Sequence, residues 1–112
     1  AFKKTILNLN NEGKHYRDFT YINDVTEIMY LLMKVKLKAK YDIFNVCSNN
    51  PQYVKTIISN FKKNYGKLFI KNIPKNNLDV FKTHGNNTKI KKILKFSKFT
   101  SFESGFLNTY KW

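Results

Sequence analysis

The residue best suited to chemistry in this sequence is Arg17, in the segment Arg17-Asp18-Phe19. It is the only arginine among 21 basic residues, and all the others are lysines. A planar guanidinium donates two parallel hydrogen bonds to a phosphate or a carboxylate, which a lysine ammonium cannot do. The presence of an arginine here, where all other basic residues are lysines, indicates that Arg17 makes two hydrogen bonds to one phosphate or carboxylate. A structural contact between Arg17 and an aspartate within a sheet is the alternative.

Other motifs for catalysis or metal binding are missing or weak. The two histidines are far apart in sequence, and the single cysteine, Cys47, ends an apolar run typical of a buried, inert thiol. Tyr30 and Lys34 have the Y-x-x-x-K spacing, but they lie among core-type residues, which favours a chance match. No Gly-rich phosphate loop occurs. We therefore predict no catalytic, cofactor-binding or metal-binding residue within these 112 positions.

The composition limits the class of protein. The formal charge is 21 − 7 = +14, which raises the possibility of a basic nucleic-acid-binding module. The scattered lysines favour a solvated surface instead, and we expect no nucleic-acid partner. No run of about 18 apolar residues is present, so no membrane partner is expected. One cysteine cannot form an internal disulfide framework, and we expect a cytoplasmic protein.

Strand and helix patterns alternate along the chain and would place Arg17 in a strand. No capping residue precedes Phe2, which favours a helix already under way and a chain that is part of a longer fold. We expect Asn23 to cap the helix that follows the Arg17 strand. Helices are predicted at residues 2–9, 23–38, 52–65, 88–94 and 101–112, strands at 15–22, 41–47 and 67–73, and turns at 10–13 and 48–51.

This alternation predicts an α/β fold with parallel strand pairing. The nearly continuous apolar run at 41–47 is typical of a strand covered on both faces. Three strands are few for a sheet, and a lone chain would leave strand edges unpaired. The pattern therefore predicts a portion of a larger sheet, and a fragment without independent activity is one interpretation.

Four segments in order resemble one enzyme family, the extended short-chain dehydrogenase/reductases that act on nucleotide sugars. GKHYRDFTYINDV is similar to R-D-F-T-Y-[IV]-D-D-V, and YDIFNVCSNNP is similar to Y-x-[IV]-[FY]-N-[IV]-G-x-x-x-P. LDVFKTHGNNTKIKKILKF resembles G-D-V-P-x-T-H-A-N-I-S-x-x-x-x-x-L-G-[FY], and FTSFESGFLNTYKW resembles x-T-S-[IL]-E-x-G-[IL]-x-x-[FY]-x-x-W. The Thr-His-x-Asn variant is most similar to the UDP-glucuronate 4-epimerase branch.

The resemblance implies that residues 1–112 are the C-terminal, sugar-nucleotide-binding part of a Rossmann-type enzyme, with the last sheet strands and a small α/β substrate-binding lobe. A missing N-terminal portion would bind NAD, and the parent enzyme would be a cytoplasmic homodimer acting on a UDP-sugar. The residues implied in substrate binding are Arg17 at the diphosphate, Phe19 near the nucleotide, Asp79 at the ribose region, and Asn76 with Lys75 at the position of a second phosphate arginine.

The sequence also departs from the family motifs. Asn76 replaces that second arginine, Leu78 and Phe81 replace a glycine and a proline around Asp79, and Cys47 replaces a glycine. These changes are typical of a divergent or decayed copy.

Overall fold

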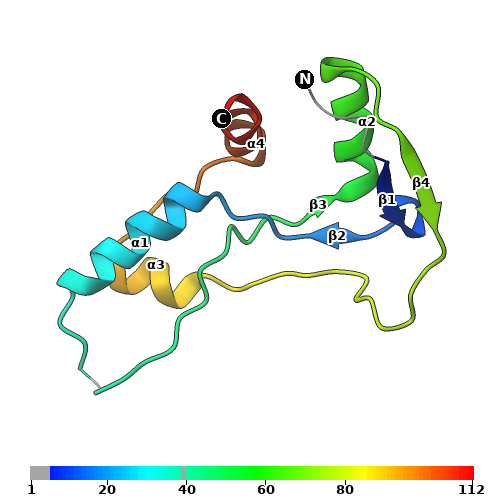
Figure 1. The fold of residues 1–112 in the computed structure, drawn as a ribbon. Helices are drawn as coiled ribbons and strands as arrows, with labels where there is room; N and C mark the ends of the chain where they lie inside the picture. The colour runs from blue at the N-terminus through cyan, green and yellow to red at the C-terminus, as the bar shows by residue number, and fades with distance from the viewer. Residues whose placement is uncertain (1–5, 39) are drawn as a thin grey trace. The chain divides into compact units, whose positions relative to one another are not determined.

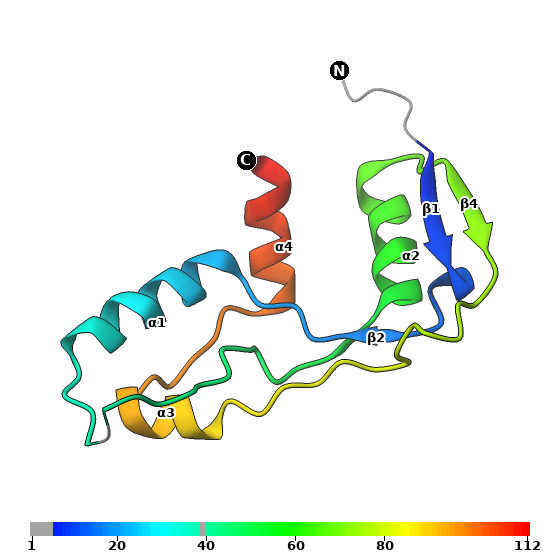
Figure 2. The ribbon, with the colours of Figure 1, turned by 60° about the horizontal axis from the view of Figure 1, so that its bottom comes forward.

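The computed structural model describes residues 6–38 and 40–112 (Figures 1 and 2). They form two compact units. Unit 1 comprises the described residues up to Arg17 together with Pro51–Thr83, and unit 2 comprises Asp18–Asn50 with His84–Trp112. The chain therefore passes from one unit to the other three times.

The elements alternate between strands and helices. In order they are β1 (Leu7–Asn10), the 3-10 helix η1 (Asn11–Gly13), β2 (Tyr16–Arg17), α1 (Ile22–Lys34), β3 (Gln52–Tyr53), α2 (Val54–Tyr65), β4 (Ile70–Ile73), α3 (Thr88–Leu94) and α4 (Phe102–Lys111). No helix in the described part of the chain is both long and apolar enough to cross a membrane.

Unit 1 is built on a parallel pair of strands, β1 and β4, with α2 alongside them (Figures 1 and 2). Leu9 on β1 is its most buried apolar residue. Gly13 has a φ of +74°, and a Cβ there would lie 3.1 Å from the backbone nitrogen of Lys55 in α2. Glycine therefore allows both the left-handed turn after β1 and the close approach of the chain to α2.

The prediction of a helix at residues 2–9 is wrong where the structure describes it. Residues 2–5 lie outside the described part, and Leu7–Asn10 form β1. Leu7 and Leu9 also fit a two-residue period, and the pairing from Leu7↔Ile70 to Asn10↔Ile73 satisfies the backbone of this segment. Long-range pairing thus decides a local pattern that was ambiguous.

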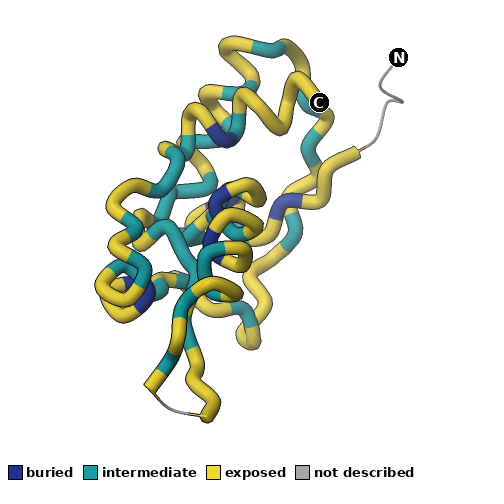
Figure 3. The backbone as a smooth tube through the Cα atoms, turned by 90° about the vertical axis from the view of Figure 1, so that its left-hand side faces the viewer, coloured by how far each residue is buried: buried dark blue, intermediate teal, exposed yellow. Residues whose placement is uncertain are grey.

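Unit 2 packs α1, α3 and α4 around a small core. Ile28 of α1 and Ile90 of α3 are fully buried. The buried carboxylate of Asp24 accepts hydrogen bonds from the Thr100 backbone nitrogen at 2.8 Å and its hydroxyl at 2.6 Å, which fixes the approach to α4. Figure 3 shows how short the buried stretches of the chain are.

Two other stretches, 15–22 and 41–47, differ from the sequence prediction. The strand expected at 15–22 is reduced to Tyr16–Arg17, and α1 begins at Ile22 with Tyr21, not Asn23, as its N-cap. The segment 41–47 forms no strand within the described chain, and Tyr41 and Ile43 are 84% and 81% exposed. A strand needs a neighbour to satisfy its backbone groups, and the described residues offer this segment none.

Most of the remaining predictions are confirmed. The helix predicted at 52–65 begins only at Val54, because Gln52–Tyr53 form β3 and pair with β2. Helix α2 ends at Tyr65 before Gly66, which has a φ of +111°. Strand β4, helix α3 and helix α4 lie within the expected ranges, and Ser101 caps α4 by accepting a hydrogen bond from the backbone nitrogen of Ser104. The result is the mixed α/β architecture that the alternation of patterns predicted.

Helix α1 carries two apolar faces. One contains the buried Ile28 and packs within unit 2. A second face presents Ile22, Met29 and Met33, which follow one another at intervals of seven and four residues and are 62%, 60% and 79% exposed. A helix with one apolar face covered and a second one exposed is typical of an element that packs between two layers.

Candidate functional site

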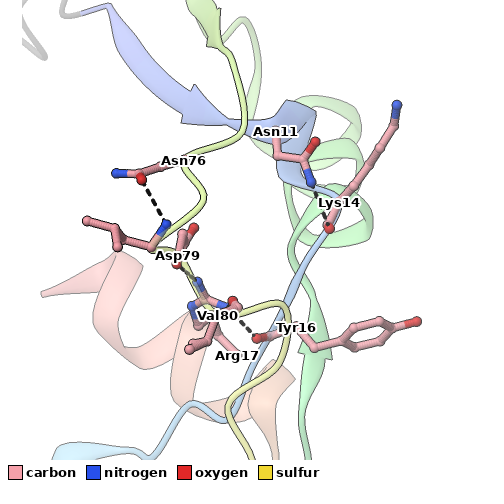
Figure 4. Close-up of polar contacts among 8 residues, drawn as sticks. Asn11, Lys14, Tyr16, Arg17, Asn76, Asp79 and Val80 are labelled. Carbon is pink, nitrogen blue, oxygen red and sulfur yellow. Dashed lines mark hydrogen bonds and ion pairs between the residues drawn. The ribbon is translucent and has the colours of Figure 1, made fainter.

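The guanidinium of Arg17 is held by three acceptors in unit 1. Its Nη1 donates to the carbonyl oxygens of Tyr16 at 2.8 Å and Val80 at 2.9 Å, and its Nη2 donates to Asp79 Oδ1 at 2.5 Å (Figure 4). We call these four residues the Arg17 cluster. The side chains of Arg17 and Asp79 are 24% and 30% exposed, so the ion pair is neither buried nor fully solvated.

The loop that follows β4 brings Asp79 to Arg17. Asn76 Oδ1 accepts a hydrogen bond from the Leu78 backbone nitrogen at 2.9 Å, and Asn76 O accepts one from the Asp79 nitrogen at 3.0 Å. This is the local turn that asparagine side chains favour. The backbone of Tyr16 then bonds to the loop on both sides, through Phe81 O at 2.9 Å and the Thr83 nitrogen at 3.2 Å.

Counting donors shows what the Arg17 cluster can do. A guanidinium has five N–H donors. Three are used by acceptors among the described residues, so the Nε–H and one Nη2–H keep their capacity for a further acceptor. A guanidinium held in one orientation with two donors to spare is suited to binding an anion such as a phosphate.

The five predicted substrate-binding residues fall into two groups. Arg17 and Asp79 form the ion pair, and the side chain of Asn76 organises the turn that carries Asp79. Lys75 is exposed next to Asn76 in the same loop. Phe19 belongs to unit 2, where its ring lies 5.5 Å from that of Phe102 and its side chain is 45% exposed. The structural alternative was an Arg17–aspartate contact within a sheet. An ion pair with Asp79 exists, but Asp79 lies in the loop after β4 and not in a strand.

Sequence reasoning missed a second polar cluster, in unit 2. Asp18 Oδ1 accepts hydrogen bonds from Ser48 Oγ at 2.5 Å and the Asn50 nitrogen at 3.3 Å. Asp18 Oδ2 accepts from the Asn49 nitrogen at 3.2 Å and the Gly85 nitrogen at 3.0 Å. Burial opposes ionisation, yet together these four donors lower the pKa of Asp18. The motif Ser-Asn-Asn-Pro predicts a turn with exposed backbone N–H groups, but it does not indicate that Asp18 accepts their hydrogen bonds.

Cys47 lies beside this second cluster. Burial, and secondarily the charge of Asp18, raise the pKa of its thiol. A raised pKa disfavours the thiolate that a nucleophilic cysteine needs. The thiol also packs against Gly85, where an added Cβ would lie 2.8 Å from Cys47 Cβ. The interpretation of Cys47 as a packing residue accords with both observations.

The other candidate patterns have ordinary surroundings. Lys34 Nζ lies 3.9 Å above the centre of the Tyr30 ring, so it faces the aromatic ring and not the hydroxyl. His84 Nε2 lies 2.6 Å from Asn49 Oδ1. No group of three or more potential metal ligands occurs among residues 6–38 and 40–112. The sequence also contains no Gly-rich loop of the kind that holds the phosphates of NAD.

The sequence of this chain is similar to part of a curated protein. No family model matches the chain. An uncharacterized protein of Methanocaldococcus jannaschii is 30% identical to it over 117 aligned residues, covering 99% of this chain and 35% of that protein. The chain thus spans about a third of the length of this curated relative.

Solved structures share the fold. MoeE5, solved in complex with UDP-glucuronic acid and NAD, matches 95% of this chain and 36% of its own with a TM-score of 0.85 and 19% identity. TunA, an NAD-dependent NDP-hexosamine 5,6-dehydratase, matches 96% of this chain and 34% of its own with a TM-score of 0.80 and 19% identity. UDP-glucuronic acid 4-epimerase from Bacillus cereus, in complex with NAD, matches 91% of this chain and 32% of its own with a TM-score of 0.70 and 23% identity. The expected α/β fold class is confirmed: the chain has the mixed α/β fold, with parallel strand pairing, of about a third of each of these solved chains.

Proposed function

We propose that this chain is the substrate-binding portion of an NAD-dependent nucleotide-sugar epimerase or dehydratase, in which Arg17 binds the diphosphate of a UDP-sugar. The observation that carries the proposal is the Arg17 cluster. Its guanidinium is fixed by Asp79 and by two carbonyl oxygens, and it keeps two N–H donors for an anion. The likeness in fold to enzymes solved with UDP-glucuronic acid or NAD supports the choice of ligand.

A fixed diphosphate is useful because it lies away from the reacting carbon of the sugar. Binding energy gained at such a remote group can position the sugar for reaction. In the proposed complex Arg17 supplies this anchor, and Asp79 accepts from the ribose region. Asn76 and Lys75 correspond to the second phosphate-binding arginine of the family motif, and the resemblance assigns Phe19 to the nucleotide.

We assign NAD binding to an N-terminal portion outside residues 1–112, and no residue of this chain takes part in the chemical step. The exposed face of α1 supports this division, because Ile22, Met29 and Met33 are apolar and uncovered. The unpaired apolar segment with Tyr41 and Ile43 supports it as well. Both features would be covered by a parallel sheet of the missing portion. The isolated chain is then inactive as an enzyme.

The finer assignment is to a UDP-glucuronate 4-epimerase-like enzyme, based on the segment Thr83-His84-Gly85-Asn86. This assignment also includes a homodimeric parent enzyme, a cytoplasmic location and a role in polysaccharide biosynthesis. The neighbours in structure include dehydratases as well as epimerases, so the test must compare ligands.

Calorimetric titration of UDP into the 112-residue protein tests the anchor. Arg17→Ala is expected to weaken UDP binding at least about tenfold, because a charge-assisted hydrogen-bond pair is lost. Lys14→Ala is the matched control, since Lys14 is also a cation paired with a carboxylate, that of Glu12, in unit 1. It should change the affinity less than about twofold.

Two further ligands sharpen the result. Uridine lacks the diphosphate, so its binding should not distinguish Arg17→Ala from the wild type. UDP-glucuronate should bind more tightly than UDP-glucose if the finer assignment is right. Equal affinity of Arg17→Ala and the wild type for UDP, with both proteins folded by circular dichroism, would reject the proposal.

A further inference from the structure

The three passages of the chain between the units meet at one carboxylate. The passages fall after Arg17, after Asn50 and after Thr83. Asp18 is the first residue of unit 2 at the first passage. Its oxygens accept hydrogen bonds from Ser48, Asn49 and Asn50 at the second passage and from Gly85 at the third. We call these five residues the Asp18 cluster.

We infer that Asp18 is a positioning residue: its carboxylate holds the three connecting segments together at the edge of unit 2. The inference does not depend on the proposed substrate. It rests on the four hydrogen bonds, which join segments 30 and 67 residues away in sequence to one side chain.

The same three segments are joined in unit 1 by their backbones. The Val54 nitrogen donates to His15 O at 3.0 Å, and the Tyr16 nitrogen donates to Phe81 O at 2.9 Å. Strand β2 also pairs with β3 through Tyr16↔Tyr53 and Arg17↔Gln52. In unit 2 the carboxylate of Asp18 joins the same three segments through its four hydrogen bonds.

The geometry requires a carboxylate and not an amide. Each oxygen of Asp18 accepts from two donors. In asparagine one of these oxygens is replaced by an NH₂ group, which donates and cannot accept. Whichever way the amide is turned, two of the four donors lose their acceptor, and an unsatisfied donor is costly.

Hydrogen exchange followed by NMR tests the inference. Asp18→Asn should lower the protection factors of the Asn50 and Gly85 amides about tenfold, because local opening becomes easier. The Gly105 amide, which donates to Ser101 O within α4, should keep its protection. Asp42→Asn is the matched control: Asp42 also accepts a backbone hydrogen bond in unit 2, from Ile43, but joins no passage between units.

A pH profile separates positioning by the charge from mere packing. In the wild type, protection of the Asn50 and Gly85 amides should fall as acid protonates Asp18, whereas in Asp18→Asn it should be low and flat. The other titratable side chains in contact with this cluster are Cys47, whose thiol senses the charge of Asp18, and His84, whose Nε2 lies 2.6 Å from Asn49 Oδ1.

Ser48→Ala provides a milder variant should Asp18→Asn fail to fold. It removes one donor to Asp18 and the Ser48 Oγ that also accepts from the Asn50 nitrogen. Protection at Asn50 should fall by about threefold while Gly105 is unaffected. Unchanged protection at Asn50 and Gly85 in a folded Asp18→Asn, or at Asn50 in Ser48→Ala, would overturn the inference.

Discussion

Arg17 and Asp18 are neighbours in the chain, but the two units use them in opposite ways. The guanidinium of Arg17 meets three acceptors in unit 1 and keeps two donors for another partner. The carboxylate of Asp18 receives two donors on each oxygen in unit 2. A charged group with capacity to spare is suited to a ligand, whereas one whose capacity is filled by the fold is suited to holding the fold together.

The two surroundings also differ in packing. In the Arg17 cluster, the loop residues Asp79 and Val80 are flanked by Leu78 and Phe81, which are 90% and 60% exposed. The Asp18 cluster adjoins the tight contact of Gly85 with Cys47. This contact gives a meaning to two departures from the family motif. The motif has glycine at the position of Cys47 and alanine at that of Gly85, so here the larger side chain has moved to the other side of the contact. We expect these two differences from the motif to compensate each other sterically.

Gly85→Ala should have the largest effect on the Asp18 side of the comparison. The added Cβ would lie 2.8 Å from Cys47 Cβ and against its sulfur. Overpacking of this kind should reduce the free energy of unfolding by about 3 kcal/mol. Urea denaturation followed by circular dichroism measures it.

The double variant Cys47→Gly with Gly85→Ala restores the arrangement of the motif. It should recover all but about 1 kcal/mol of the loss, since the cycle isolates the coupling between the two positions. Additive losses would show that the two changes do not compensate, and the contrast in packing between the clusters would then fail.

Acid should destabilise the protein through Asp18. Because its pKa is lower in the folded state than in the unfolded one, Asp18 contributes stability above the unfolded pKa, which is about 3.9. This contribution is lost as the pH falls through the folded pKa. Stability should therefore decline more steeply below about pH 4 in the wild type than in Asp18→Asn. Urea midpoints measured at several acidic pH values give the two slopes, and parallel slopes would place the acid sensitivity elsewhere.

The sequence indicated more of the Arg17 cluster than of the Asp18 cluster, and the reason is physical. A lone arginine among lysines is visible in composition, and the turn at Asn76 is a local pattern. The Asp18 cluster depends on backbone N–H groups, which every residue except proline carries, so no residue type reveals them.

The difference between local patterns and contacts with distant residues also explains which elements were predicted wrongly. Helices α2, α3 and α4 followed from local periodicity and capping. Strand β1 and the segment 41–47 depended on whether a distant partner was present. Leu7–Asn10 found one in β4, and Tyr41 and Ile43 found none in the described chain. Local patterns therefore predicted these helices, while strands required knowledge of the neighbours.

Arg17→Lys should have a smaller effect on stability, on the unit 1 side. A lysine can reach one of the three acceptors but cannot hold the fork between Val80 O and Asp79, so the free energy of unfolding should fall by about 1 kcal/mol. Urea denaturation measures the change, and UDP titration should show a larger relative loss. A loss of stability as large as that of Gly85→Ala would mean that Arg17 also serves mainly to hold the fold together.

The smallest expected effect concerns the thiol of Cys47. Its pKa is raised first by burial and then by the negative charge of Asp18, so alkylation by iodoacetamide at neutral pH should be slower than that of a free cysteine. Asp18→Asn removes the charge and leaves most of the burial. The alkylation rate should therefore rise by a factor of about two to five and remain below that of free cysteine. An increase to the rate of free cysteine would show that Asp18→Asn had opened the packing around Cys47. The carboxylate would then act on the thiol through the fold and not through its charge.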